Sequence, residues 1–596
     1  MYDGRFLPTS AKEAHEAGIE RFDIILFSGD AYVDHPSFGV AVIARILEAE
    51  GYTVAVVPQP NWRDDLRDFR KMGAPRLFFG VTAGNMDSMV NHYTAARRLR
   101  SDDAYTPGGR AGARPDYATT VYTRILKRLY PDVPVVIGGI EASLRRLAHY
   151  DYWHDRMMPS ILVDSGADLL CYGLGDKAMP RIARFIADGF NKKRLHTLRQ
   201  TAYITDREGL ARLDPEETVT LHPYEECLKD KKLLGKNFVH IETQSNVMEP
   251  KRLVEETDGR FVVVNAPYPH LDTKEIDRTY DLPFTRMPHP RYRGKGDIPA
   301  WEMIKFSVNT HRGCFGGCSF CTISAHQGKF ISSRSEESIL REVRAITRME
   351  GFRGYLSDIG GPSANMYGMK GRNERACRTC KRPSCLFPKV CPNMDNGHER
   401  LLELYRKVDA VEGIKKSFIG SGIRYDLFDD RFGDAYLREV IVNHTSGKLK
   451  VAPEHTEDEV LAMMRKPPFA LFERLNERFR RICEQNGLRY LLIPYFISSH
   501  PACRMEDMKR LATRMRGLDF RLEQVQDFTP TPMTLSSTIF YTGIDPYTDK
   551  PVFTEHDPER KKQQKSLFFG SPGADRRGAG NDNRKKDYSR RQWNKR

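Results

Sequence analysis

Short apolar runs alternate with amphipathic segments along the first 190 residues. Buried strands separated by helices of this kind are typical of a mostly parallel sheet that is covered on both faces. The pattern predicts a doubly wound, Rossmann-like α/β domain over residues 1–190. Its expected strands are 21–30, 53–60, 76–84, 134–143 and 167–175, and helical spacing fills 38–51, 120–130 and 179–189.

The second half of the chain repeats this alternation after a stretch of weaker periodicity. Residues 191–300 are expected to connect two domains, since PFTRMPHPRYRGKGDIPAW (283–301) has the Pro, Gly and Arg content of a linker. Six strands separated by helices then favour a partial (β/α)6 barrel over 301–555, with its chemistry at the carboxyl ends of the strands. The expected barrel strands are 304–310, 354–360, 417–423, 448–454, 489–498 and 521–528.

The C-terminal segment of the chain is basic. The 596 residues carry a formal net charge of +15, and the segment from Ser571 to Arg596 holds nine Lys and Arg against three Asp and Glu. We expect a disordered basic tail over 556–596 that makes at most weak, salt-sensitive contact with nucleic acid. No apolar run has the length of a membrane helix and no signal peptide is evident, so we expect a cytoplasmic protein.

Seven of the eleven cysteines fall between Cys314 and Cys391. The first three, Cys314, Cys318 and Cys321, have the spacing C-x3-C-x2-C in a glycine-rich loop after the first barrel strand. Three thiolates leave one iron of a [4Fe–4S] cluster open to a cosubstrate, and this assignment is favoured. Zinc with His311 or His326 as a fourth ligand is the alternative, together with plain core cysteines.

A second set of four cysteines lies in an insert at 371–397 after the second barrel strand. Its spacing is C-x2-C-x4-C-x5-C, which fits either a zinc site or an auxiliary iron–sulfur cluster, with a metal-free loop as the alternative. The members are Cys377, Cys380, Cys385 and Cys391. Nearby basic residues are expected to offset the thiolate charge or to hold an acidic substrate: Arg375, Arg378, Lys381, Arg382 and Lys389.

The chain resembles the YgiQ family of radical SAM proteins from near its start to about residue 555. The resemblance is carried by FSGDAYVDHPSFG, VVIGGIEASLRRLAHYDYW, SDIGGPSANMYG, SGIRYDL, KVAPEH, YFISSHP and VQDFTPTPMTLS, together with the first cysteine motif. It implies an enzyme that uses a [4Fe–4S] cluster to cleave S-adenosylmethionine (SAM) and form a 5′-deoxyadenosyl radical. It also implies a one-electron reductant such as flavodoxin or ferredoxin, but no particular substrate.

The resemblance implies further residues for SAM. Phe320 matches the aromatic position near the adenine, and Gly360 and Gly361 match a glycine pair near the SAM amino group, although Pro362 replaces the usual acidic residue after that pair. Ser421 and Arg424 fall where the ribose and carboxylate are held, with Glu454 a weaker candidate. Each of these positions also fits an ordinary turn at a strand end.

The N-terminal domain resembles the cobalamin domains attached to some radical SAM enzymes. The Asp-x-His-x-x-Gly signature of base-off cobalamin is not met, because His35 follows Asp34 directly. Cobalamin is therefore unsupported, and His35 is interpreted as structural or as a loop residue. The second hypothesis for the whole chain is a metal-dependent nucleic-acid or protein-binding module whose cysteines are structural.

Overall fold

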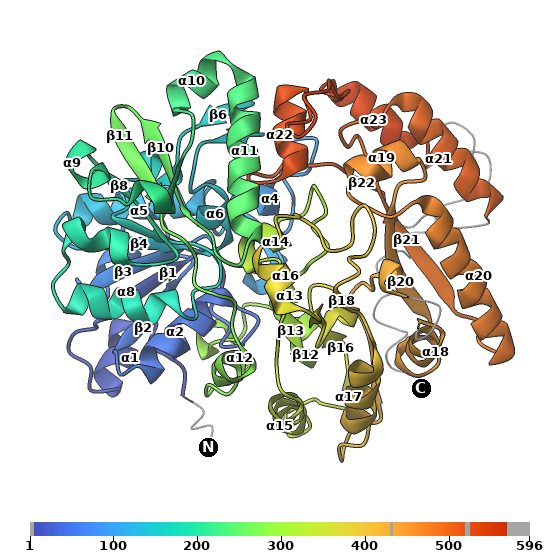
Figure 1. Cartoon of the computed structure of the whole chain (residues 1–596). Helices are drawn as coiled ribbons and strands as arrows, with labels where there is room; N and C mark the ends of the chain where they lie inside the picture. Colours follow the sequence, from blue (N-terminus) through green and yellow to red (C-terminus); the bar gives the residue numbers. More distant parts are fainter. Residues whose placement is uncertain (1–4, 429–432, 519–524, 569–596) are drawn as a thin grey trace, which may run out of the picture.

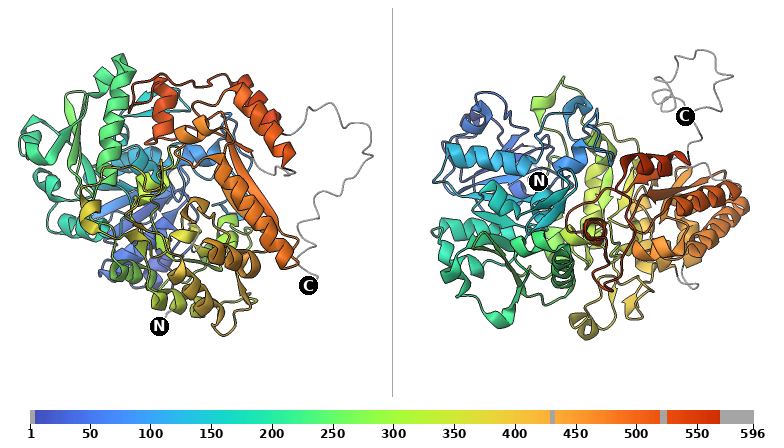
Figure 2. Two further views of the ribbon diagram at one scale, coloured as in Figure 1. Left: turned by 45° about the vertical axis from the view of Figure 1, so that its right-hand side comes forward. Right: turned by 90° about the horizontal axis from the view of Figure 1, so that it is seen from above.

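The computed structural model describes residues 5–428, 433–518 and 525–568, and its two halves lie side by side (Figure 1). The first half, blue to green, is built on a nine-stranded sheet of order β2-β1-β3-β4-β7-β8-β11-β10-β9. The second half, yellow to red, carries shorter sheets, both parallel and antiparallel, with helices outside the parallel ones (Figure 2). The fold is therefore mixed α/β with one large, mostly parallel sheet.

Five parallel strands form one side of the large sheet, with β2 at its edge, and they match the five strands expected from the sequence. They are β1 (Ile24–Ser28), β2 (Val54–Pro58), β3 (Phe78–Thr82), β4 (Val135–Gly138) and β7 (Leu169–Cys171). Helices α2 (Gly39–Ala49) and α8 (Ala178–Ala187) pack on one face and α5 (Ala118–Leu129) on the other. Because both faces are covered, every residue of β1 and β2 is buried.

The predicted boundary at residue 190 falls inside this sheet. Strand β8 (Thr201–Thr205) pairs antiparallel with β7, and β10 (Arg252–Thr257) and β11 (Arg260–Val264) extend the sheet further with the short β9 (Thr218–Thr220). Asp258 and Gly259 join β10 to β11, and both have positive φ, 49° and 68°. This Asp-Gly pair is a two-residue hairpin turn, so much of the expected connecting region belongs to the first half.

If β15 and β16 are taken as one interrupted strand, six strand segments of the second half overlap the expected barrel strands, β19 at Ser417 alone. Parallel pairs join β12 to β16, β15 to β19, and β20 to β21 to β22. Their bounds are β12 (Ser307–Asn309), β15 (Tyr355–Leu356) with β16 (Asp358–Gly360), β19 (Lys416–Ser417), β20 (Lys448–Glu454), β21 (Leu491–Ser498) and β22 (Val525–Asp527). Within the described residues no strand pairing joins β19 to β20.

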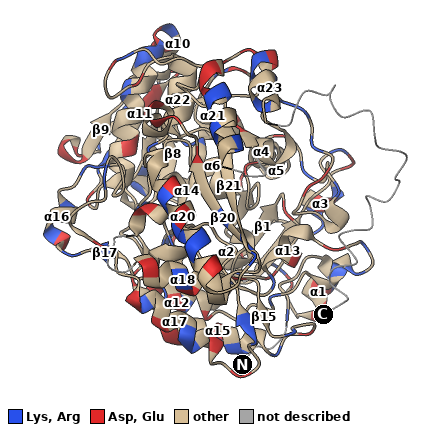
Figure 3. Cartoon of the chain, turned by 90° about the vertical axis from the view of Figure 1, so that its right-hand side faces the viewer, with Lys and Arg blue, Asp and Glu red and all other residues tan. Residues whose placement is uncertain are grey.

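Amphipathic helices cover the outside of these strands. Their apolar faces form one core with the strands, and their Lys, Arg, Asp and Glu residues are interspersed along the outer surface (Figure 3). The helices are α15 (Glu336–Ile346), α17 (Glu399–Asp409), α18 (Gly433–His444), α20 (Phe469–Gln485) and α21 (Met505–Gly517). None of the helices described is both long and apolar enough to cross a membrane.

Helix packing and ion pairs hold the two halves together. Helix α11 (Lys231–Asn246) runs against α22 (Leu535–Thr542), and Arg465 binds Glu242 with two contacts of 2.7 and 2.9 Å. Arg312, close to the first cysteine, binds Asp176 of the first half at 2.9 and 3.0 Å. These contacts place the carboxyl edge of the large sheet next to the cysteine loop.

The expected disordered tail begins instead with an ordered helix. Helix α23 (Pro558–Ser566) packs its Lys561 and Gln564 into the protein, where the exposed fractions are 7% and 0%. Gln564 accepts hydrogen bonds from the backbone N–H and the hydroxyl of Ser499 at 3.0 and 3.1 Å. The rest of the expected tail, residues 569–596, lies outside the described residues.

Candidate functional site

The first three cysteines lie in one loop between β13 (His311–Arg312) and α14 (Ile323–Gln327). Glycines shape this loop, because a Cβ at Gly313 would lie 2.2 Å from the Phe330 carbonyl oxygen, and one at Gly317 would lie 2.5 Å from that of Pro383. Both glycines also have positive φ, 88° and 60°, which other residues adopt at a cost. The loop is thus specified by its backbone as well as by its thiols.

The three thiols lie close enough to influence one another electrostatically. Burial raises the pKa of Cys321 to about 12, and the charges of Cys318 and Cys314 add to the increase. Burial also raises the pKa of Cys314, while the nearby Arg424 lowers it. Such thiols hold their protons in the metal-free protein and release them only when a metal binds.

Arg424 supplies the positive charge at this loop. Its Nη1 donates to Cys318 Sγ at 3.1 Å, while Nε and Nη2 bind the carboxylate of Asp426 at 2.9 and 2.5 Å. The side chain is 10% exposed, so the interaction occurs in a medium of low dielectric constant. An Arg beside a thiolate favours its charged form and would offset the charge of a thiolate-bound cluster. Its predicted contact with SAM stays a prediction.

The glycine pair lies at the carboxyl end of β16, close to the cysteine loop. A Cβ at Gly361 would lie 2.5 Å from the His311 ring, and one at Gly360 would lie 2.7 Å from Ser421 Oγ. Ser421 donates its hydroxyl to Asp358, a residue that the sequence patterns did not single out. Asp358 also accepts the backbone N–H of Ser421 at 3.1 Å, so it fixes the turn that carries Ser421.

Glu454 stands at the carboxyl end of β20 in a strained conformation. Its φ is 71°, a value that non-glycine residues rarely adopt, and the strand register shifts just before it. Its carboxylate is 3.6 Å from Lys466 Nζ, and burial raises its pKa. Backbone strain of this kind is common at functional sites, so Glu454 remains a candidate site residue.

Phe320 belongs to an aromatic cluster that joins the two halves. The cluster includes Tyr150 and Tyr152 of the first half and Phe528 and Phe540 of the second. The Phe320 ring also meets the His500 ring edge-on, with 6.0 Å between centroids. Its place near an adenine remains a prediction.

A hydrogen-bonded chain supports the cysteine loop from behind. His500 Nε2 lies 2.7 Å from Ser536 Oγ, which lies 2.8 Å from Ser319 Oγ, between Cys318 and Phe320. His500 and Ser536 are fully buried. Residues 36 and 217 positions apart meet here, so no local pattern could have predicted the chain.

The donor set of this loop consists of three neighbouring thiols with an arginine beside them. Among the described residues, no three His, Cys, Asp or Glu side chains converge so as to hold one metal ion. Each iron of a cluster takes its own thiolate, so three thiols fit three irons of a [4Fe–4S] cluster, and the same thiols could serve zinc with a fourth ligand.

Comparisons with known proteins identify the family. A family model described as "Radical SAM N-terminal" matches residues 6–307. A UPF0313 protein from Bacteroides thetaiotaomicron is 58% identical over 95% of this chain and 94% of its own length. UPF0313 protein YgiQ from Escherichia coli is 43% identical, over 94% of this chain and 83% of its own length.

The chain belongs to the UPF0313 (YgiQ) family of radical SAM proteins. Two solved structures are similar at low identity. TsrM from Kitasatospora setae, a radical SAM methyltransferase with cobalamin and a [4Fe–4S] cluster bound, is 16% identical over 86% of this chain and 77% of its own, with a TM-score of 0.49. OxsB, a cobalamin-dependent radical SAM enzyme, is 12% identical over 90% of this chain and 57% of its own, with a TM-score of 0.44.

The second cysteine set of this UPF0313 chain packs directly on the first. Strands β17 (Lys370–Gly371) and β18 (Met394–Asp395) pair and close the insert at its base. The Cys385 N–H donates to the Phe315 carbonyl at 3.0 Å, and Ser384 Oγ donates to the Gly316 carbonyl at 2.6 Å. The insert therefore forms one wall of the first cysteine loop.

The buried cation beside the second set comes from outside the insert. Burial raises the pKa of Cys385 and of Cys377, and Lys329 opposes the increase at both thiols. Lys329 is 2% exposed and donates to the Arg382 carbonyl at 2.6 Å. Arg378, which was expected to offset thiolate charge, instead pairs at the surface with Glu374 and Glu249 at 3.0 and 3.2 Å.

His35 in the first half is buried rather than exposed in a loop. It is 1% exposed, and burial lowers its pKa well below the usual value, so the ring is neutral. Its Nδ1 accepts the Ser37 N–H at 3.1 Å, and the preceding Asp34 pairs with Arg45 at 2.6 Å. These contacts fit the structural role expected for His35.

Proposed function

We propose that this protein is a radical SAM enzyme that holds a [4Fe–4S] cluster on Cys314, Cys318 and Cys321. The observation that carries the proposal is the meeting of these three thiols, with Arg424 donating to Cys318 Sγ at 3.1 Å, at the carboxyl edge of the strands in a chain of this family. When bound, the cluster supplies the electron that splits SAM into methionine and a 5′-deoxyadenosyl radical.

We infer that the six parallel strand segments of the second half form a partial (β/α)6 barrel around this site. The residues at its carboxyl edge would then bind SAM, with the backbone of Gly360 and Gly361 at the amino group and Ser421 or Glu454 near the ribose. Asp358 would keep Ser421 oriented through the hydroxyl hydrogen bond. Phe320 and its aromatic neighbours would exclude water from the adenine side.

We further propose that Cys377, Cys380, Cys385 and Cys391 hold a second metal centre, either zinc or iron–sulfur. Support comes from their direct packing on the first loop and from the buried Lys329 beside them. An iron–sulfur centre there would suit electron entry from a one-electron reductant such as flavodoxin or ferredoxin. A zinc centre would instead hold the wall of the first loop in place.

Iron and sulfide analysis with EPR spectroscopy of the reduced, anaerobically reconstituted protein tests both proposals. Wild type should give a [4Fe–4S]⁺ signal that SAM perturbs, and a variant with Cys314, Cys318 and Cys321 changed to Ala should lose it. A variant with the four insert cysteines changed to Ala should keep the SAM-sensitive signal. Cys483→Ala, on the outer helix α20, is the matched control and should behave as wild type.

The same experiment identifies the metal of the insert. Iron that remains in the triple variant would belong to the insert, whereas zinc in the wild type that is lost from the insert variant would assign zinc there. If reconstitution gives zinc alone and SAM has no effect, the enzyme proposal fails. A binding module with structural metal sites would then be the function to pursue.

A further inference from the structure

A cavity of about 560 Å³ lies between the two halves, at the carboxyl ends of β1, β3, β4 and β7. The second half closes it with Asn309, His311, Arg312 and Pro362, beside the first cysteine loop. In sheets whose central order is 2-1-3-4-5, ligands bind where the strand order reverses, between the first and third strands. The cavity lies at that position, and its volume is that of a small-molecule site.

Gly39 lines the cavity, and no close contact within the protein explains why this position has no side chain. Most other glycines in the lining are explained by the protein, since a Cβ at Gly84 would lie 2.2 Å from Asp30 and one at Gly80 would lie 2.4 Å from Leu26. At Gly39 the nearest atom to an added Cβ is Asn85 Oδ1 at 3.8 Å, and no positive φ is imposed. Gly39 is the first residue of α2, and its N–H donates to Asn85 Oδ1 at 3.0 Å, so close approach of a ligand would explain a residue without a side chain there.

Two histidines, the buried His311 and the half-buried His326, each have a buried ring nitrogen without a partner in the lining of this cavity. His311 is 1% exposed, and its Nδ1 is 2.8 Å from Thr310 Oγ1. Its Nε2 has no hydrogen-bond partner in the described part of the chain, and neither has the buried Nδ1 of His326. Buried polar atoms are nearly always paired, so two orphaned nitrogens at one cavity point to a ligand. Burial lowers the pKa of each ring to about 4, so both rings are neutral.

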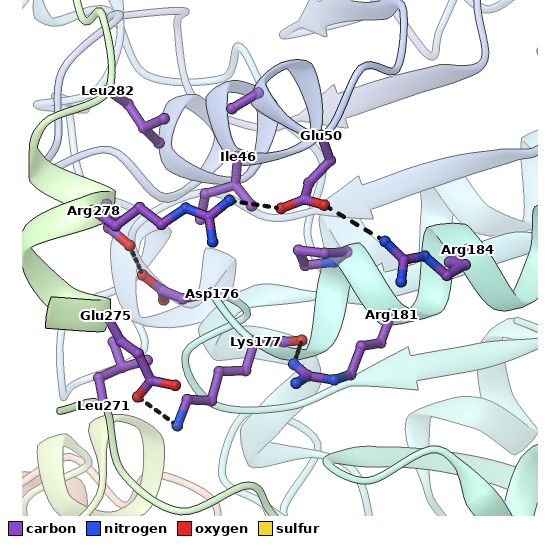
Figure 4. Close-up of a pocket in the computed structure, with 13 residues that line it drawn as sticks. Ile46, Glu50, Asp176, Lys177, Arg181, Arg184, Leu271, Glu275, Arg278 and Leu282 are labelled. Carbon is purple, nitrogen blue, oxygen red and sulfur yellow. Dashed lines mark hydrogen bonds and ion pairs between the residues drawn. The ribbon is translucent and has the colours of Figure 1, made fainter.

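The cavity carries no unbalanced charge. Arg312 and Asp176 are the only Asp, Glu, Lys or Arg residues in its described lining, and they pair with each other at 2.9 and 3.0 Å. Asp176 also borders a neighbouring pocket that is lined by charged side chains, including Glu50, Arg184 and Arg278 (Figure 4). A phosphate or carboxylate would find no free cation in the cavity, whereas valine, isoleucine and methionine side chains favour an apolar ring.

We propose that this cavity binds an uncharged, planar nitrogen heterocycle whose edge is hydrogen-bonded by His311 and His326. The heterocycle is supplied either by a free nucleoside-like substrate or by the ring of a larger cofactor. Because His311 packs against Gly361, the ligand would lie beside the SAM site. That adjacency, but not the binding itself, rests on the proposed function.

Equilibrium dialysis of the full-length reconstituted protein, with SAM at saturation to fill its own site, tests the proposal. The probes are guanosine and riboflavin. Gly39→Leu places a side chain into the open wall, and Gly517→Leu is the matched control because Gly517 also has open space and an ordinary φ but lies on α21. His311→Phe keeps a ring of similar shape and removes the free nitrogen.

At least one probe should bind the wild type with a Kd below about 1 mM. Gly39→Leu should bind that probe at least tenfold more weakly, and Gly517→Leu should bind it with the wild-type affinity. His311→Phe should lower the affinity for that probe about tenfold, because one hydrogen bond is lost. Binding of guanosine would assign a nucleoside-like substrate, and binding of riboflavin would assign a cofactor ring.

The proposal is overturned if no probe binds below about 1 mM, or if Gly39→Leu binds as well as wild type. Guanosine 5′-monophosphate that binds at least tenfold more tightly than guanosine would overturn the assignment of an uncharged ligand. Failure of the radical SAM proposal appears separately, as the absence of a SAM-sensitive EPR signal, and leaves the dialysis result unaffected.

Discussion

Arg424 and Asp426 form a buried ion pair whose remaining guanidinium nitrogen reaches Cys318. Arg424→Leu leaves a buried carboxylate without its partner and should lower the free energy of unfolding by about 3–5 kcal/mol. The double variant Arg424→Leu/Asp426→Leu should recover most of that loss. Urea denaturation of the metal-free protein measures both values, and equal losses in the single and double variants would contradict the ion-pair account.

Ser536 links His500 to the cysteine loop through its hydroxyl. Ser536→Ala should leave two buried polar atoms unpaired, lower the free energy of unfolding by about 1–3 kcal/mol, and alter the EPR signal of the reconstituted cluster. Ser537→Ala is the matched control, since the neighbouring Ser537 hydroxyl is buried without a partner in the described residues. If both variants lose the same stability, the hydrogen-bonded chain has no special role.

Among individual residues, motif spacing predicted proximity only for those that are close in sequence. Cys314, Cys318 and Cys321 share one loop, so their meeting follows from the motif. Asp358 accepts a hydrogen bond from Ser421, and Lys329 opposes the rise in the pKa of Cys385. Both partners lie far along the chain. Their roles depend on tertiary packing, which local pattern does not contain.

The insert packs against the first cysteine loop at Gly317. Gly317→Ala adds a Cβ that would lie 2.5 Å from the Pro383 carbonyl at a φ of 60°. We expect the insert to detach, at a cost of about 1–3 kcal/mol in the free energy of unfolding, and to become sensitive to trypsin. Gly422→Ala, with open space and an ordinary φ, should leave the digestion pattern unchanged.

The alternation of strands and helices was predictable because most strands are buried on both faces and keep an apolar run. The extension of the large sheet past residue 190 was not predicted. Strands β8 and β11 pair antiparallel with their neighbours, and β10 pairs antiparallel with β11 but parallel with β9. All three have partly exposed ends, so their apolar pattern is weaker. The turn at Asp258 and Gly259 was the available signal, and it would have indicated a hairpin.

For the molecule as a whole, buried neutral histidines should make stability depend on pH. Burial lowers the pKa of His149, His311 and His326 to about 4 and of His455 and His500 to about 3. The unfolded chain binds these protons below about pH 6.5 while the folded chain does not, so acidification favours unfolding. We expect a loss on the order of 5 kcal/mol between pH 7 and pH 5.

Urea denaturation across this range measures the loss. Two buried carboxyl groups act in the opposite direction, since burial raises the pKa of Asp30 to about 6 and of Glu255 to about 8. Their destabilising effect fades as the pH falls, and it offsets only part of the histidine effect. A free energy of unfolding that stays constant from pH 7 to pH 5 would contradict the burial of these rings.

Helix α23 completes the second half by placing Gln564 against Ser499. A chain that ends at residue 557 should lose about 1–3 kcal/mol in the free energy of unfolding, because the Ser499 N–H and hydroxyl lose their acceptor. A chain that ends at residue 568 keeps the helix and should unfold as the full chain does. Thermal unfolding of the two truncated proteins compares them directly.

The ion pair between Arg312 and Asp176 has a consequence for how the protein matures. Asp176 belongs to the half that leaves the ribosome first, and domains generally fold as units from the N-terminus during synthesis. Arg312 lies just ahead of Cys314, so the cysteine loop emerges onto a docking partner that has already folded. Insertion of the proposed cluster is therefore expected to follow assembly of the large sheet, and a chain stalled before that step would remain without it.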